Sequence, residues 1–476
     1  LSYSGNLVFG NLYQNNHRRT SAPSTATPAR KTALELVRRS RESHQFLSAF
    51  APRVLEAAQL EGADKAFARL LAQGALSLQV TLDALINEVL RTPRDIQDDV
   101  RDALRISAYE IIYLHKEDHA AVDQGVELVR SIAPRATGVA NYVLHRIVEA
   151  KERFPEGDPE TSLEAAARFY GFPDWLATAI KKDIGTRNAI ALMARSLEPA
   201  PVYFSANELS TSRDEIVRLL EASGIEFSTH RSLVAGTSGA DPIFELTHRG
   251  DVGTESFSTL LQHEQIVVSD ASAQSIVMRA VEVLPKDARL LEIGAGRGVK
   301  SLLFQSACAR RNIQLAAYDV LDLSAKKLSV LEERVVKAGG SIASALAHDA
   351  TKPLPVADEA YDLIFIDAPC TGLGTLRRHP EIKARLHKED VKKLSATSQA
   401  MLVQAAQKVK PGCYLMFATC TILKEENEKT VKRFLASPAG SAFEIVPLGA
   451  QGTPFFKTPF DTGADLHFAA LLQKKR

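Results

Sequence analysis

The first third of the chain carries apolar residues at helical spacing. From about residue 31 to residue 151 they recur every three or four positions, for example at Leu34, Val37, Leu82, Leu85 and Ile86. This period places apolar side chains on one face of a helix. We therefore expect an all-helical domain in this region.

The middle of the chain changes its pattern twice. Residues 154–159, which hold two prolines and a glycine, are typical of a linker, and residues 163–197 return to helical spacing. Short extended runs follow at 202–205 and 243–246, with one helical stretch between them at 213–223. We expect a small connecting domain here.

From Asp287 onward, short apolar runs alternate with amphipathic stretches. The runs, each followed by a helical pattern, are residues 290–293, 315–318, 363–366 and 414–417. Nearly continuous apolar strands separated by helices indicate a parallel sheet that is covered by helices on both faces. The fold class predicted for this part is α/β, with a doubly wound sheet.

The composition is that of an ordinary globular protein, since 45% of the 476 residues are hydrophobic and 24% are charged. This length exceeds what one core can hold and predicts two or three domains. No apolar stretch approaches the roughly 18 residues that a membrane span needs. The formal net charge of +1 does not indicate a nucleic-acid partner, for which local basic patches would be needed.

The first 30 residues and the cysteines indicate the compartment in which the protein works. The first 30 residues are polar, with scattered Ser, Thr and Pro, and predict a disordered leader. The four cysteines lack regular spacing, and no Cys/His cluster suggests a disulfide framework or a zinc site. We therefore expect a protein of the reducing cytoplasm that binds neither a metal nor a membrane.

A glycine-rich loop follows the apolar run that ends at Ile293. Its residues are Gly294, Ala295, Gly296, Arg297, Gly298, Val299 and Lys300. Glycines let the backbone approach a ligand, and the following helix offers free N–H groups. The third glycine comes two residues after the second, so the spacing is not that of a dinucleotide-binding loop.

Acidic residues stand at or near the ends of four predicted strands, namely Glu292, Asp319, Asp349 and Asp367. Ligands of open α/β sheets bind at the carboxyl ends of the strands. Carboxylates at that edge suit a cofactor with free ribose hydroxyls and a cationic centre, which favours S-adenosylmethionine over a nicotinamide dinucleotide. For any one of these acids alone, a solvated carboxylate is an equally good explanation.

Two of the four cysteines end apolar runs. Cys370 follows Asp367 by three residues, and Cys420 ends the run that begins near residue 414. Most intracellular cysteines are small buried hydrophobes, which is the interpretation we keep for Cys308 and Cys413. Two thiols at the ends of neighbouring strands in a cofactor-binding fold instead predict nucleophilic chemistry.

The sequence around these thiols resembles that of the RNA cytosine-5 methyltransferases, and especially the RsmB-type enzymes. Residues 362–383 are similar to motif IV of that family, and residues 418–428 are similar to its motif VI. Helical segments between residues 100 and 147 resemble the NusB-type RNA-binding fold.

The resemblance implies a role for each site residue. Cys420 is expected to attack C6 of a cytosine, and Cys370 to assist breakdown of the adduct. Asp367 is expected to hydrogen-bond the cytosine edge as charge develops at N3, and Lys300 matches the loop lysine of the family. The methyl donor is expected to be lined by residues 294–300, Asp319, Asp349 and Asp367.

The resemblance also implies an order of domains and a substrate. The expected order is a leader over 1–30, a NusB-like helical RNA-binding domain over 31–155, a connecting domain over 160–255 and a Rossmann-like S-adenosylmethionine-dependent methyltransferase domain over 256–476. The expected substrate is cytosine in ribosomal RNA of the small subunit, and the protein is expected to act as a monomer.

A local excess of basic residues follows Cys370. Its members are Arg377, Arg378, His379, Lys383, Arg385, His387, Lys388, Lys392 and Lys393. Such a run is usually a solvated helix face, but beside an active site it predicts a track for RNA phosphates.

Three other functions remain open from the sequence. A DNA cytosine methyltransferase would need only the thiol of Cys370, so Cys420 argues against it. A non-catalytic RNA-binding scaffold remains an alternative because loop 294–300 departs from the Cys-Ala-Ala-Pro-Gly-Gly-Lys string of the family. A dinucleotide oxidoreductase fits least, since the glycine spacing differs and a pair of thiols has no place in its chemistry.

Overall fold

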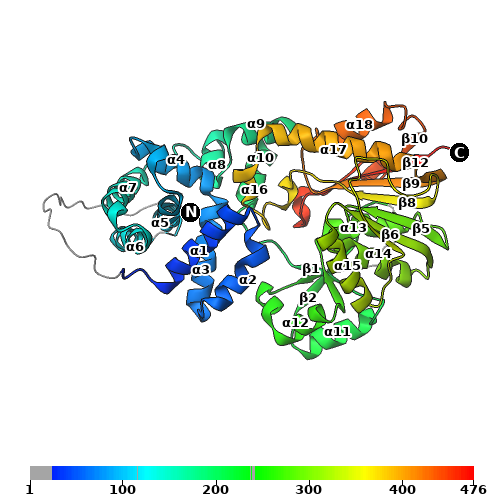
Figure 1. Ribbon diagram of the computed structural model, residues 1–476, viewed down its shortest axis with the longest axis horizontal. Coiled ribbons are helices and arrows are strands. Elements are labelled where there is room, and N and C mark those ends of the chain that lie inside the picture. Colours follow the sequence, from blue (N-terminus) through cyan, green and yellow to red (C-terminus); the bar gives the residue numbers. More distant parts are fainter. Residues whose placement is uncertain (1–23, 115, 236, 238–241) are drawn as a thin grey trace. The chain divides into compact units, whose positions relative to one another are not determined.

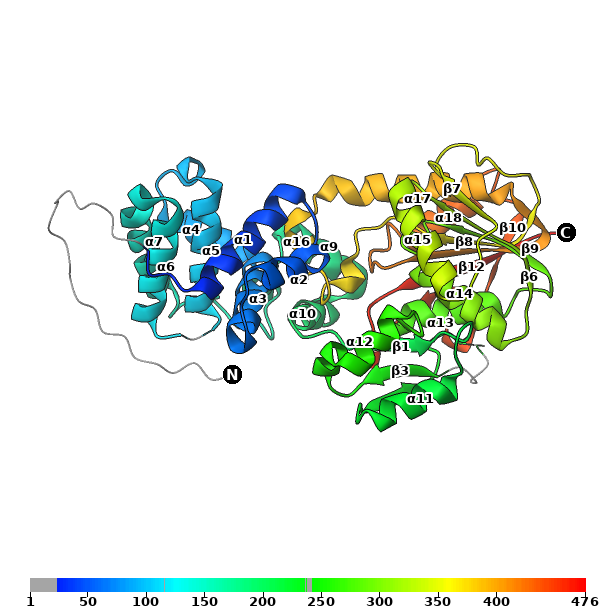
Figure 2. The same ribbon diagram turned by 60° about the horizontal axis from the view of Figure 1, so that its bottom comes forward.

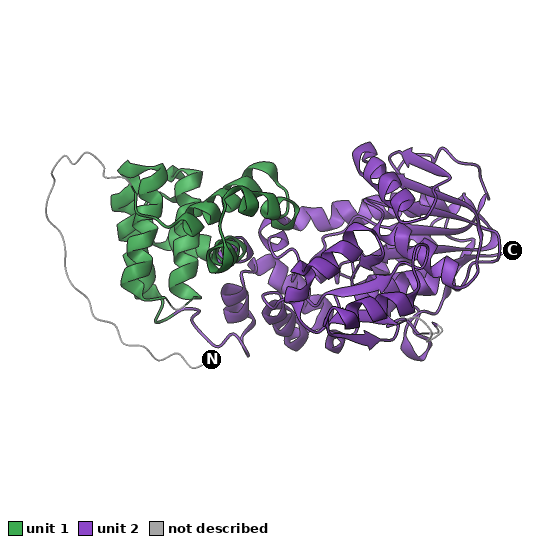
Figure 3. Cartoon of the chain, turned by 90° about the horizontal axis from the view of Figure 1, so that it is seen from below, with its two compact units in different colours: residues 1–75, 82–153 green, residues 76–81, 154–476 purple. Residues whose placement is uncertain are grey.

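The structure is a computed structural model that describes residues 24–114, 116–235, 237 and 242–476. The chain forms two compact units, drawn in green and purple in Figure 3. The first unit comprises residues 1–75 and 82–153, and the second comprises residues 76–81 and 154–476. In the described part of the chain, no helix combines the length and the hydropathy that a membrane crossing requires.

The first unit is helical, as the spacing of apolar residues predicts. Its helices are α1 (Pro28–Ser43), α2 (Leu47–Ala57), α3 (Gly62–Ser77), α4 (Gln79–Val89), α5 (Asp98–Ile112), α6 (Asp118–Ile132) and α7 (Thr137–Ala150). The end of α3 and the start of α4, residues 76–81, are assigned to the second unit. Helix α5 is buried along most of its length. Charged residues on α5 are paired, since Arg30 donates hydrogen bonds of 2.8 and 2.6 Å to Glu110.

The predicted leader falls largely outside the described residues, which begin at Ser24. The hydroxyl group of Ser24 donates a 2.6 Å hydrogen bond to the carbonyl oxygen of Glu127. Helix α1 begins at Pro28, three residues before the predicted start of the helical domain. Proline suits this first helical position, because its fixed φ angle is already helical.

The second unit opens with three short helices, α8 (Leu163–Tyr170), α9 (Asp174–Ile184) and α10 (Thr186–Arg195). They form a hydrophobic cluster that includes Leu176 and Ile180 of α9. Ile382 from the short helix α16 (Ile382–Arg385) and Leu423 join the same cluster. The three helices therefore pack against the two segments that follow the predicted catalytic cysteines.

A small antiparallel sheet comes next, in the order β2-β3-β1-β4. Its strands are β1 (Tyr203–Ala206), β2 (Phe227–His230), β3 (Ile243–Leu246) and β4 (Ile266–Val268), and its helices are α11 (Arg213–Ala222) and α12 (Glu255–Gln262). Figure 2 shows this layer beside the large sheet of the same unit. The two extended runs and the helix predicted here are confirmed, whereas β2 and β4 were not predicted.

The large sheet has the strand order β10-β12-β9-β8-β5-β6-β7, with β11 paired to β12. Its strands are β5 (Ala288–Ile293), β6 (Leu315–Asp322), β7 (Ser344–Ala347), β8 (Tyr361–Asp367), β9 (Val409–Thr419), β10 (Phe443–Val446), β11 (Phe456–Lys457) and β12 (Phe468–Lys474). Neighbours from β7 to β9 are parallel, whereas β12 pairs antiparallel with β9 and β10. The predicted parallel core is confirmed, and an antiparallel edge adds to it.

Helices cover both faces of the large sheet (Figure 1). On one face lie α13 (Ala271–Val281), α14 (Val299–Arg310) and α15 (Ala325–Lys337), and on the other lie α17 (Lys388–Ala406) and α18 (Glu428–Leu435). Each face has its own hydrophobic core. Because the central strands are buried on both faces, they read as continuous apolar runs.

Candidate active site

The glycine-rich loop joins β5 to α14 in conformations that favour glycine. Gly294, Gly296 and Gly298 have φ angles of 82°, 59° and 85°. A Cβ atom on Gly294 would lie 2.4 Å from the carbonyl oxygen of Asp367. The loop therefore needs glycine both for its shape and for its close approach to β8. The other predicted residues of the loop lie between the glycines or open α14, and they are Ala295, Arg297, Val299 and Lys300.

The structure corrects the acidic residue on β6. This strand runs on to Asp322, so Asp319 lies inside it, where its carboxylate accepts a 2.7 Å hydrogen bond from the hydroxyl group of Tyr361. Asp322 ends the strand, and its carboxylate accepts hydrogen bonds of 3.0 and 2.8 Å from the backbone N–H groups of Gly296 and Ser324. Asp322, rather than Asp319, therefore faces the glycine-rich loop.

Two more side chains lie near the end of β6 at this edge of the sheet. Leu323 follows Asp322 and is 76% exposed, so it leaves an apolar surface open beside the loop. Asp349 lies just beyond β7, where Thr351 donates two hydrogen bonds of 2.9 and 2.7 Å that lower the pKa of its carboxyl group. Carboxylates at the ends of β6 and β7, with an apolar surface between them, fit the adenosine part of a methyl donor.

Glu292 lies beneath the loop, one residue before the end of β5, and is fully buried. Ser301 and Tyr318 each donate a 2.6 Å hydrogen bond to its Oε2 atom. Its Oε1 atom has no hydrogen-bond partner among the described residues. Burial raises the pKa of this carboxyl group to about 7, although both hydrogen bonds act to lower it. An oxygen of this kind is a group that a bound cofactor can satisfy.

The two predicted thiols lie side by side. Strands β8 and β9 are parallel neighbours, and Asp367 at the end of β8 pairs with Ala418 near the end of β9. The Sγ atoms of Cys370 and Cys420 are 3.2 Å apart, and both residues are free cysteines. The hydrogen bond to Cys420, followed by burial, raises the pKa of Cys370 well above its ordinary value. Cys370 therefore keeps its proton and can donate it to the sulfur atom of Cys420.

A lysine and a carboxylate complete the group. The Nζ atom of Lys300 donates a 2.6 Å hydrogen bond to Oδ2 of Asp367. Burial lowers the pKa of Lys300, but the Asp367 carboxylate and the charge of Cys420 outweigh burial and leave the pKa raised. Lys300 is therefore a cation that holds Asp367 in place and lies within electrostatic range of Cys420. The structure thus brings together the four predicted catalytic residues.

The predicted track for phosphates is only partly at the surface. Arg378 is only partly exposed and is paired within the second unit, where it contacts Asp270 at 3.1 Å and Asp465 at 2.5 Å. Lys383 is 0% exposed, and Arg377 donates to the backbone carbonyl of Gly463. Lys383 is therefore internal, and Arg377 and Arg378 are partly buried, with carboxylates and carbonyl groups from distant parts of the chain as their partners. The exposed members of the run are His387, Lys388, Lys392 and Lys393.

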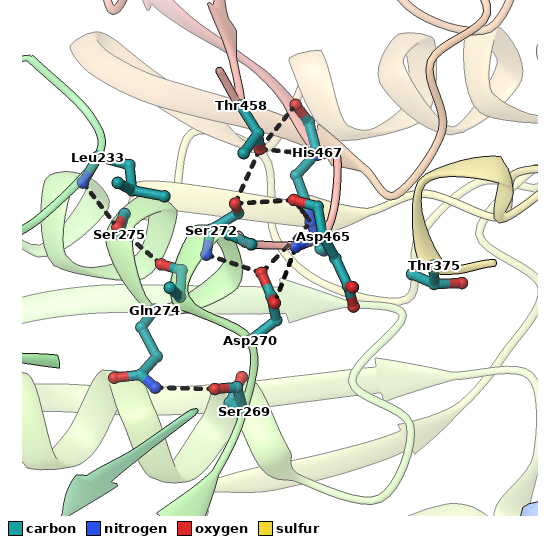
Figure 4. A network of polar contacts seen from close by, with 12 residues as sticks. Leu233, Ser269, Asp270, Ser272, Gln274, Ser275, Thr375, Thr458, Asp465 and His467 are labelled. Atoms are coloured by element: carbon teal, nitrogen blue, oxygen red, sulfur yellow. Dashed lines mark hydrogen bonds and ion pairs between the residues drawn. The ribbon is translucent and has the colours of Figure 1, made fainter. Parts of the chain in front are cut away.

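Figure 4 shows the polar network around Asp270 and Asp465. Asp270 caps α13 by accepting a 2.8 Å hydrogen bond from the N–H group of Ser272, and it also accepts one of 2.9 Å from the N–H group of Asp465. The hydroxyl group of Ser272 donates to the carbonyl oxygen of Asp465 at 2.9 Å and accepts from Thr458 at 2.8 Å. This network fixes the segment before β12 next to the start of α13.

Asp322, Leu323 and Glu426 were not among the site residues predicted from the sequence. Asp322 could have been found by extending the apolar run of β6 through Val320, since the acid that ends a strand is the one at the ligand edge. Glu426 is 1% exposed and contacts the residues that follow both thiols, which no local pattern indicates.

Three family models match the chain. The model described as 16S rRNA methyltransferase RsmB/F matches residues 281–458, and the NusB family matches residues 27–149. A ferredoxin-like domain of RsmF/B-like methyltransferases matches residues 172–236. Between them the three models cover most of the chain.

Relatives and solved structures agree with these matches. A probable ribosomal RNA small subunit methyltransferase B from Bacillus subtilis (strain 168) is 26% identical over 415 residues, which are 86% of this chain and 88% of that protein. The crystal structure of PH0851 has a TM-score of 0.75 at 21% identity and covers 95% of this chain and 100% of that one. The structure of NSun6 from Pyrococcus horikoshii with SFG, an analogue of S-adenosylmethionine, has a TM-score of 0.52 at 17% identity and covers 64% of this chain and 99% of that one. The predicted fold class, a NusB-like helical domain before an α/β methyltransferase domain, is confirmed.

Proposed function

We propose that the chain is a member of the RsmB/F family of methyltransferases and that it methylates C5 of a cytosine in small-subunit ribosomal RNA. The cofactor of the family is S-adenosylmethionine, as the sequence predicts, and it supplies a methyl group on a cationic sulfur. The observation that carries the proposal is the pair of thiols 3.2 Å apart at the ends of β8 and β9.

The proposed reaction needs a nucleophile because C5 of cytosine is too weak to take a methyl group unaided. Addition of the Cys420 thiolate to C6 pushes electrons to C5, which can then accept the methyl group. As the thiolate adds, N3 takes up a proton from water and donates a hydrogen bond to the Asp367 carboxylate. Lys300 keeps this carboxylate in position through their 2.6 Å contact. These residues come from the ends of three adjacent strands, β5, β8 and β9.

Breakdown of the adduct restores the aromatic ring. Water takes the proton from C5, the electrons of that C–H bond re-form the C5–C6 double bond, and Cys420 leaves C6 as a thiolate. Cys370 assists this step, since its S–H group can donate to the leaving sulfur at 3.2 Å. The raised pKa of Cys370 keeps that proton available. The two thiols therefore have different tasks in one catalytic cycle.

The methyl donor is held by the glycine-rich loop and the carboxylates at the edge of the sheet. We propose that the backbone of residues 294–299 contacts the amino-acid part, that Asp322 contacts the ribose hydroxyls, and that Leu323 and Asp349 contact the adenine. The free N–H groups at the start of α14 and the exposed face of Leu323 support this arrangement. We also propose that the protein acts as a cytoplasmic monomer without a metal, and that its NusB domain helps to bind the RNA.

Bisulfite sequencing of ribosomal RNA from a strain that lacks the gene tests the proposal. We expect one small-subunit cytosine to lose its methyl mark, and we expect the intact gene, but not a Cys420→Ser copy, to restore it. An unchanged map of methylated cytosines would exclude this substrate.

The alternative of a non-catalytic scaffold has its own test, because the glycine-rich loop departs from the string usual in the family. Calorimetry with S-adenosylmethionine is expected to show binding at sub-millimolar concentration. If the protein does not bind the methyl donor in that range, the scaffold is favoured.

A further inference from the structure

A buried carboxylate links the two segments that carry the thiols. Glu426 lies between β9 and α18 and is 1% exposed. Its Oε1 atom accepts a 2.7 Å hydrogen bond from the backbone N–H group of Thr371. Its Oε2 atom accepts hydrogen bonds of 2.6 and 3.0 Å from the hydroxyl groups of Thr371 and Thr421. The two hydroxyl oxygens themselves lie 2.8 Å apart.

The partners of Glu426 are the next residues along the chain from the thiols. Thr371 follows Cys370, and Thr421 follows Cys420. Both thiols lie beyond the paired part of β8 and β9, since Asp367 is the last residue of β8 in that ladder. Beyond the ladder, the N–H group of Gly374 donates a 2.9 Å hydrogen bond to the carbonyl oxygen of Cys420, and Glu426 adds a side-chain link between the same two segments.

We propose that Glu426 is a positioning residue of the methyl-transfer site, which holds Cys370 and Cys420 at their working distance. This inference rests on the proposed function. A buried carboxylate is costly unless it is hydrogen-bonded, and here all three bonds come from the residues beside the thiols. Reacting groups must be held within about 0.5 Å of their productive geometry, so losing this link is expected to slow the chemical step.

The charge of Glu426 also acts on the thiol of Cys370. The pKa of Cys370 is raised by its hydrogen bond to Cys420, then by burial, and then by the charges of Cys420 and Glu426. A negative charge near Cys370 therefore helps to keep this thiol protonated. The thiol can then donate a hydrogen bond to the sulfur atom of Cys420, which lies 3.2 Å from the sulfur atom of Cys370. A neutral side chain in place of Glu426 removes that contribution while it keeps the size of the residue.

The first test compares Glu426→Gln with Glu425→Gln. Glu425 is the adjacent residue, but its side chain contacts Lys429 and Arg433 at the surface and not the threonines. For Glu426→Gln we expect kcat to fall about 10- to 100-fold while KM for S-adenosylmethionine stays within about twofold, because positioning acts on the chemical step. Glu425→Gln is expected to keep both constants. If Glu426→Gln does not fold, Thr421→Val, which removes one hydroxyl group, is measured in the same way and is expected to lower kcat with KM unchanged.

The second test reads the distance between the thiols without any methyl transfer. The oxidant diamide takes one hydrogen from each of two thiols that can meet, which leaves a disulfide bond. We expect the rate of Cys370–Cys420 disulfide formation, followed by mass spectrometry, to fall at least about fivefold in Glu426→Gln and to stay unchanged in Glu425→Gln. Unchanged kcat and an unchanged oxidation rate in folded Glu426→Gln would overturn the inference. If the wild-type protein forms the disulfide readily but does not methylate RNA, the proposed function fails while the positioning by Glu426 stands.

Discussion

Lys383 offers a prediction whose size follows from the structure. It lies on α16, in the segment after Cys370, and is 0% exposed. Its Nζ atom donates a 2.6 Å hydrogen bond to the carbonyl oxygen of Tyr170 and lies 4.6 Å from the ring centre of Phe172. Lys383→Met keeps a long unbranched side chain in the same space and removes the ammonium group.

The perturbation changes how stability depends on pH. Burial lowers the pKa of Lys383 from 10.5 to about 7. Between these values the unfolded chain binds more protons than the folded one, so the free energy of unfolding rises with pH over this window. The difference of about 3.5 in pKa corresponds to about 5 kcal/mol at most, since each pKa unit is worth roughly 1.36 kcal/mol. The contacts with Tyr170 and Phe172 favour the charged form and reduce this value.

The assay uses Trp175, the single tryptophan of the chain, which packs on the same hydrophobic cluster as Ile382. Urea unfolding is followed by its fluorescence at about pH 7.5 and about pH 9.5. From about pH 7.5 to about pH 9.5, we expect the free energy of unfolding of the wild type to rise by roughly 2 kcal/mol relative to that of Lys383→Met. Lys388→Met, at an exposed position, is the control and is expected to track the wild type. A constant difference between wild type and Lys383→Met at both pH values would refute the reasoning.

Three further predictions follow from single contacts. Asp322→Asn is expected to weaken S-adenosylmethionine binding in calorimetry at least about tenfold more than Asp319→Asn does, and equal effects would contradict the corrected assignment. Gly374→Ala is expected to lower kcat, because its Cβ atom would lie 1.7 Å from the carbonyl oxygen of Leu466, and wild-type kcat would show that the segment can adjust. In the wild type, the free energy of unfolding is expected to fall as pH rises from 4.5 to about 7, because folded Glu292 holds its proton more tightly than unfolded Glu292 does. Glu292→Gln is expected to remove this fall, as measured by urea unfolding. An equal dependence of the unfolding free energy on pH in both proteins would count against the buried carboxyl group.

Local patterns were sufficient for much of the fold. The helical period of the first unit and the apolar runs of β5, β6, β8 and β9 were recognised because the spacing of nearby apolar residues determines which face of an element is buried. The small strands β2 and β4 were missed because they are short, and β2 is partly exposed, so their burial does not give a clear alternation. The antiparallel strands β10 and β12 depend on pairing with β9 that no local signal sets.

The site shows the same division. The glycine-rich loop and both thiols were predicted because each lies directly after a recognisable strand. Arg378 was placed in a surface track, but it is only partly exposed, and its partners are the carboxylates of Asp270 and Asp465, which are distant in the chain. The role proposed for Glu426 likewise depends on contacts across the ends of two strands. Charged residues that are buried with distant partners cannot be separated from solvated ones by composition or spacing.

The central claim is that Cys420 is the nucleophile and Cys370 the assisting thiol. The most direct measurement is covalent trapping on small-subunit RNA that contains 5-fluorocytosine, in which the fluorine at C5 cannot leave as a proton and the adduct therefore persists. We predict that the wild type and Cys370→Ser form a complex that survives denaturation, and that Cys420→Ser forms none. A stable complex with Cys420→Ser, together with its loss in Cys370→Ser, would contradict the account.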